Sequence, residues 1–149
     1  MIPMKNSLII AILISLVFIS CESFGPELEF PVLEKEKKVL FEFFTDKDYS
    51  ATQFDSYFVN LNVGVSLVDK ITAEEIRILK ESTGMIPFKE IPDELNKIRF
   101  EIKESVDIHR YHVSFGYSHY VRIGETFQMK AISEFLPDKE DEKLVVIKF

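Results

Sequence analysis

The sequence predicts a mainly β domain built as an antiparallel sandwich, and three observations support this class. Apolar and polar residues alternate along several segments, most clearly over residues 57–67, and this is the period of a strand with one buried face. Strands and long helices do not succeed one another regularly, so parallel βαβ units are not expected. Fourteen Phe and five Tyr supply apolar material for a core between two sheets.

These observations favour an immunoglobulin-like sandwich of about seven strands with one short helix. The alternative is an α+β domain in which that helix packs on one antiparallel sheet.

Residues 38–44 are predicted as the first strand. Val39, Phe41 and Phe43 alternate with other residues, and the segment is rich in β-branched and aromatic side chains. A helical stripe that begins at Leu33 is the other interpretation of this region.

Residues 57–67 give the strongest signal for a strand. The odd-numbered positions are all apolar, whereas the even-numbered positions include Asn60, Asn62, Gly64 and Ser66. This pattern predicts a strand whose odd face is buried.

A short helix is predicted after this strand. Thr72 and Glu75 have the spacing of a capping box, Ile76 and Leu79 form an apolar stripe, and Gly84 is placed to end the helix. We expect the helix to lie across one face or edge of a sheet.

The remaining strands are predicted from shorter alternating patterns. A connector between Pro87 and Pro92 is followed by alternation over residues 97–103. The same period returns at 127–131 and at 145–149.

Residues 109–123 are predicted to form a hairpin. The odd residues before and after the turn must share one face, and a three-residue loop at Gly116-Tyr117-Ser118 satisfies this requirement by pairing Phe115 with His119.

The three histidines, His109, His112 and His119, lie close together in the sequence. A spacing of three places His109 and His112 on opposite faces of a strand, whereas metal ligands must converge. We therefore expect no metal site and no cofactor.

The N-terminus has the features of a secretion signal. An uncharged apolar run from Leu8 to Ile19 follows Lys5. It is shorter than the roughly 20 residues of a membrane-spanning helix but fits the apolar region of a signal peptide. Cys21, the only cysteine, follows directly.

The segment Phe18-Ile19-Ser20-Cys21 resembles the lipobox of bacterial lipoproteins, in which Ile19 and Ser20 fit the pattern and Phe18 departs from it. The resemblance implies that the signal is cut before Cys21 and that the cysteine sulfur carries a diacylglycerol. It covers only the first 21 residues of the chain.

This organisation divides the chain into three parts. Residues 1–20 are the expected signal peptide, residues 21–30 are the lipidated N-terminus and a tether with a breaker at Gly25-Pro26, and residues 31–149 are a single β-rich domain.

Charge and motifs limit the possible functions. The formal net charge is −7, and the chain has no basic cluster, so nucleic acid is not an expected partner. No nucleophile elbow, phosphate-binding loop or dinucleotide fingerprint occurs. We expect a protein that is not an enzyme.

The sequence thus predicts a lipid-anchored protein of the bacterial cell envelope, expected in the outer membrane, that displays a small non-enzymatic β domain for binding or assembly. The alternative function is a carrier of a small apolar ligand. The segment 114–120, SFGYSHY, has the composition of a recognition loop, so Tyr117, His119 and Tyr120 are the candidate contacts with an unknown protein or ligand.

Overall fold

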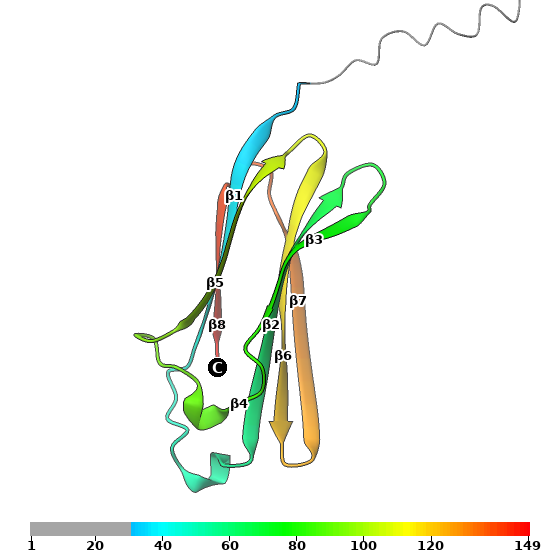
Figure 1. The fold of residues 1–149 in the computed structure, drawn as a ribbon. Coiled ribbons are helices and arrows are strands. Elements are labelled where there is room, and N and C mark those ends of the chain that lie inside the picture. The colour runs from blue at the N-terminus through cyan, green and yellow to red at the C-terminus, as the bar shows by residue number, and fades with distance from the viewer. Residues whose placement is uncertain (1–30) are drawn as a thin grey trace, which may run out of the picture. The chain divides into compact units, whose positions relative to one another are not determined.

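The computed structural model describes residues 31–149, and Val32–Phe149 form one compact unit. The predicted mainly β, sandwich-like fold is confirmed: eight strands form two sheets (Figure 1). The elements in chain order are β1 (Glu34–Phe44), η1 (Thr52–Phe54), β2 (Tyr57–Asp69), β3 (Glu75–Ser82), β4 (Ile86–Pro87), η2 (Phe88–Glu90), β5 (Ile98–Asp107), β6 (Tyr111–Ile123), β7 (Thr126–Leu136) and β8 (Glu142–Lys148).

The two sheets are unequal. One has the strand order β5-β1-β8, and the other has the order β3-β2-β6-β7, with the short β4 also paired to β2. All of these pairs are antiparallel except β1 and β8, which are parallel.

The predicted strand at 38–44 is confirmed as β1, which begins earlier, at Glu34. The inner side chains of this strand, Val39, Phe41 and Phe43, are at most 1% exposed. They face the second sheet and form part of the core.

The longest ladder joins β2 and β6, which pair without a break from Tyr57↔Ile123 to Asp69↔Tyr111. The alternation predicted for 57–67 is confirmed, since Val59, Leu61 and Val63 are at most 2% exposed. Because paired residues share a face, the odd-numbered residues of β6 also point inward.

The hairpin loop predicted at Gly116-Tyr117-Ser118 is wrong, because β6 passes straight through these residues. The close approach of β7 explains the glycine. A Cβ at Gly116 would lie 2.5 Å from the carbonyl oxygen of Ile132. Glycine is required here to let two backbones meet and not to turn the chain. The chain turns instead between β6 and β7, where Gly124 has φ +59°.

The helix predicted after residue 72 is also wrong. The residues 75–82 form β3, which pairs with β2 over most of its length. Glu75, expected to cap a helix, accepts a hydrogen bond from Ser66 Oγ of β2 at 2.6 Å. Pairing with the edge of β2 therefore outweighs the local helical signals of this segment and makes it a strand.

A tight turn replaces the start of that helix. Asp69 accepts hydrogen bonds from the backbone N–H groups of Ile71 and Thr72, both at 2.9 Å, and from Arg110 Nε at 3.0 Å. These donors, the backbone groups first, lower the pKa of Asp69 to about 2. Gly84, expected as a helix cap, has φ +69° and lies in the turn after β3.

A buried lysine closes the end of the domain at which β1 begins. Lys37 is 4% exposed, and its Nζ donates to the Asp138 carbonyl at 2.9 Å, to the Glu140 carbonyl and to Asp141 Oδ1 at 3.1 Å. These bonds fix the connection from β7 to β8, which crosses from one sheet to the other.

The other predicted strands are confirmed as β5, β7 and β8. On β8, Ile147 is buried among the core residues as the alternation suggests. On β7 the apolar residues Phe127 and Met129 point outward and are exposed.

We predict that Val63→Asp unfolds the domain, because it places an unpaired carboxylate on the buried face of β2. The expected loss is about 4 kcal/mol or more. Asn62→Asp, one residue earlier and on the opposite face, should cost about 1 kcal/mol or less. Urea unfolding of the two variants measures the difference, and equal losses would show that the register of β2 is wrong.

Candidate functional site

The three residues predicted to bind a partner lie on β6 and do not share a face. Tyr117 and His119 point inward, because they pair with the inward residues Val63 and Leu61 of β2. Tyr120 points outward and is exposed. The predicted site is therefore divided between the two faces of the sheet. Cys21 lies outside the described residues.

His119 is half-buried on the inner face of β6, beside two aromatic rings. Its ring stacks on Tyr117 with centroids 6.3 Å apart and meets the ring of Phe149 edge-on at 4.9 Å. Its Nδ1 atom is buried without a hydrogen-bond partner. Burial, and secondly the positive charge of Lys130, lower the pKa of His119 below its ordinary value of 6.5.

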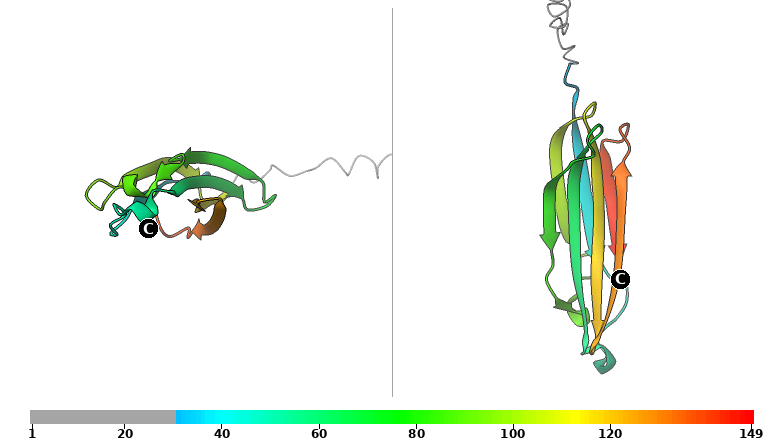
Figure 2. Two further views of the ribbon diagram at one scale, coloured as in Figure 1. Left: turned by 90° about the horizontal axis from the view of Figure 1, so that it is seen from below. Right: turned by 90° about the vertical axis from the view of Figure 1, so that its right-hand side faces the viewer.

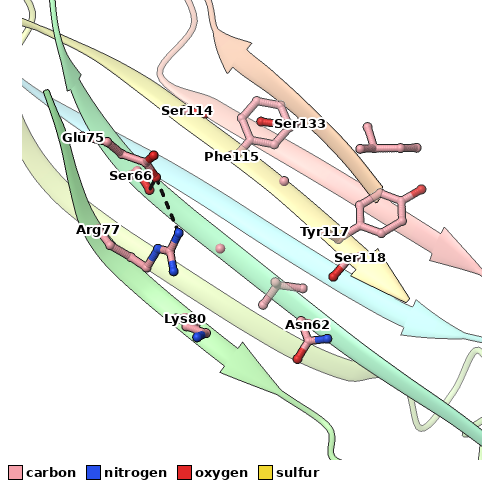
Figure 3. A pocket seen from close by; sticks show the side chains of 14 residues that line it. Asn62, Ser66, Glu75, Arg77, Lys80, Ser114, Phe115, Tyr117, Ser118 and Ser133 are labelled. Atoms are coloured by element: carbon pink, nitrogen blue, oxygen red, sulfur yellow. Dashed lines mark hydrogen bonds and ion pairs between the residues drawn. The ribbon is translucent and has the colours of Figure 1, made fainter. Parts of the chain in front are cut away.

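The outer face of the five-stranded sheet has a hollow of about 280 Å³ (Figure 3). Its floor consists of small side chains on the outward positions of β2 and β6 and at one position of β7 (Asn62, Gly64, Ser66, Ser114, Gly116, Ser118 and Ser133). Gly64, Gly116 and Ser133 are directly opposite one another across three strands. Their small size leaves the backbone of the sheet exposed at this point.

One wall of the hollow is charged. Glu75, Arg77 and Lys80 line it from β3 (Figure 3). Arg77 Nη2 lies 3.8 Å from Glu75 Oε1, which also accepts the hydrogen bond from Ser66 Oγ. The hollow can therefore offer hydroxyl groups and cationic side chains to a polar ligand.

The hollow has hydroxyl groups, but the register separates them from His119. Ser114 and Ser118 lie on the outer face of β6, whereas His119 lies on the inner face. A serine becomes a nucleophile only when a base lies within hydrogen-bond reach. His119 therefore cannot act as the base for either serine.

The sequence did not reveal this hollow, for a clear reason. The wall from β3 was predicted as a helix, and Gly116 and Ser118 were predicted as a loop. The usable signals were two runs of small or polar residues at every second position, Asn62, Gly64 and Ser66 on β2 and Ser114, Gly116 and Ser118 on β6.

A second hollow, of about 460 Å³, is lined by the segment that follows β1 and by η2. Tyr49 and Phe88 line it, and their rings meet edge-on at 4.9 Å. Phe54 meets the ring of Tyr49 at 5.0 Å, and the ring of Phe88 also meets Tyr57 at 5.6 Å and Phe149 at 5.7 Å, all edge-on. Five aromatic side chains thus pack together at this end of the domain.

The histidines do not converge in the structure. His109 lies in the turn between β5 and β6 and His112 on the outer face of β6. His112 Nδ1 is 3.5 Å from Asp138 Oδ1. Within residues 31–149 no group of three His, Cys, Asp or Glu side chains is arranged to hold a metal ion.

We predict that His119 makes the domain less stable at mildly acid pH. Its pKa in the folded state is below 6.5, so the unfolded chain binds the proton more readily, and stability decreases as the pH falls below about 6.5. His119→Phe should lose less stability than the wild type between pH 7.5 and pH 5. Urea unfolding at both pH values, with the exposed His109→Gln as control, measures this. An equal loss in wild type and His119→Phe would contradict the burial of this ring.

No protein-family model, curated protein or solved structure matches this chain.

Proposed function

We propose that this chain is a lipoprotein of the bacterial cell envelope, anchored through Cys21, whose β-sandwich domain serves binding or assembly. The observation that carries the proposal is the apolar run Leu8–Ile19 followed by Ser20-Cys21. Two or three acyl chains on Cys21 give stable attachment, because each buried methylene contributes about 0.8 kcal/mol and one chain alone is marginal.

The way in which the chain enters the domain is compatible with a tether. The Leu33 carbonyl accepts a hydrogen bond from Ile108 N at 3.2 Å, so the chain joins the domain beside the turn between β5 and β6. The polar connection after β7 lies at this same end, where Lys37 holds it. A domain attached here would keep the outer faces of both sheets free for partners.

The packing favours a role in binding or assembly over the alternative function, a carrier of a small apolar ligand. Phe41, Phe43 and Leu61 pack between the sheets and are all 0% exposed. A carrier needs a cavity of several hundred cubic ångströms around its ligand. The hollow of Figure 3 lies on the outside of a sheet and has a polar floor.

Among residues 31–149 no helix is long and apolar enough to cross a membrane.

We predict that Cys21→Ala abolishes lipid attachment. Cells that produce the wild type should incorporate labelled palmitate into this protein, which should partition into a detergent phase. The Cys21→Ala variant should carry no label and partition into the aqueous phase, because the sulfur that receives the lipid is absent.

Ser20→Ala is the matched control for this experiment, because it keeps a small residue before the cysteine and should label like the wild type. Equal labelling of wild type and Cys21→Ala, or an unlabelled wild type, would refute the anchor.

A further inference from the structure

Strand β7 is poorly covered. It pairs with β6 on one side, and no other strand among residues 31–149 pairs with its second edge. Only Leu136 of this strand is buried, and only Ile132 is half-buried. In the right-hand view of Figure 2, β7 (orange) runs along the margin of its sheet.

The outward side of β7 has a row of large apolar residues. Phe127, Met129 and Phe135 are 63%, 59% and 58% exposed. Proteins usually protect a sheet edge with charges, bulges or prolines, because an open edge pairs with other chains. A long edge strand with exposed apolar side chains therefore indicates an interface.

The edge strands on the other side of the domain are protected. β3 carries Glu75, Arg77, Lys80 and Glu81, and β5 has charges at a similar density. In β7 the only charged residues are Lys130 and Glu134. These two point to the inner face, since they pair with His119 and Phe115 of β6.

We propose that β7 is the surface through which two copies of this chain assemble, by antiparallel pairing of β7 with β7 of the second copy about a two-fold axis at Ile132. Each residue before Ile132 then lies opposite the residue equally far after it in the other copy. This register places Lys130 opposite Glu134 of the second copy, twice by symmetry. On the outer side it places Met129 opposite Phe135, also twice.

The charges select this register. An axis at Ala131 would place Lys130 opposite Ile132 and would leave Glu134 opposite Gln128. An axis at Ser133 would place Lys130 opposite Leu136. Opposite charges directly across two strands are favourable, whereas a charge opposite an apolar residue gains nothing. Only the axis at Ile132 pairs both charges.

The space beside Ile132 accommodates a second chain. A hollow of about 280 Å³ separates β7 from β8 and is lined by Phe115, Tyr117, Ile132 and Val145, among others. Ile132 of the second copy would lie at the rim of this hollow and cover apolar surface. Pairing would join the two five-stranded sheets into one continuous sheet. This inference does not depend on Cys21, although a shared membrane would raise the effective concentration of the two copies.

A disulfide test in the full chain measures the register. In a two-fold pair centred on residue 132, the two copies of Ile132→Cys lie directly opposite, within the roughly 7 Å that a disulfide requires. Gln128→Cys is the matched control on the same strand and face. Its two copies would be about 26 Å apart along the strands.

Cells that produce each variant are treated with a mild oxidant, and both membrane and soluble fractions are analysed on non-reducing gels. We expect a dimer with Ile132→Cys and none with Gln128→Cys or with the wild type, which has only Cys21. Absence of the dimer with Ile132→Cys, an equal dimer with Gln128→Cys, or a cross-link to a different protein would overturn the proposal. Because both fractions are measured, a failure of the lipid anchor does not affect this result.

A second experiment exchanges the charges of Lys130 and Glu134. In the Ile132→Cys background, Lys130→Glu and Glu134→Lys should each reduce the dimer at least threefold, because each places like charges opposite one another. The double variant Lys130→Glu/Glu134→Lys restores both pairs and should return the dimer to its original yield. Melting temperatures should stay unchanged, since both side chains are exposed. Single variants that cross-link fully, or a double variant that does not recover, would refute the pairing.

Discussion

The ladder between β2 and β6 is the constraint on which the rest of the structure depends. Its pairing is continuous from Tyr57↔Ile123 to Asp69↔Tyr111. This register determines, for each side chain of both strands, whether it lies on the inner or the outer face of the sheet. β3 and β4 attach to the free side of β2, and β7 attaches to β6. The inner face of the ladder is covered by Phe41 and its neighbours on β1, and this burial is the main source of stability.

The same ladder determines what the protein can present to partners. Its outer face combines two runs of small residues, and the hollow of Figure 3 results from their alignment. Gly116 is the position that allows β7 to approach, because a Cβ there would collide with the Ile132 carbonyl. β7 is therefore held close to β6 along one edge while its other edge stays open. The polar hollow and the open edge are the two surfaces on which the proposed role in binding or assembly rests.

The parts of the fold that the sequence predicted correctly are those in which the burial of apolar side chains decides the conformation. Alternation at Val59, Leu61 and Val63 reports a buried face directly, and it identified β2 without ambiguity. The errors came from residues with more than one physical use. Glu75 and Gly84 are suitable helix ends, but Ser66 and the open edge of β2 lie close only in the folded chain. Gly116 was taken for a turn, because the approach of β7 from beyond Gly124 is not visible in local sequence.

Hydrogen exchange at Gly116, Tyr117 and Ser118 tests the central claim most directly. As part of a strand between β2 and β7, these amides lie within two ladders and should exchange only when the domain unfolds, at rates like that of Val63. Exchange as fast as that of Glu125, in the exposed turn between β6 and β7, would show that residues 116–118 form a loop. That result would contradict the continuous ladder, and with it the division of faces on which the hollow and the open edge of β7 depend.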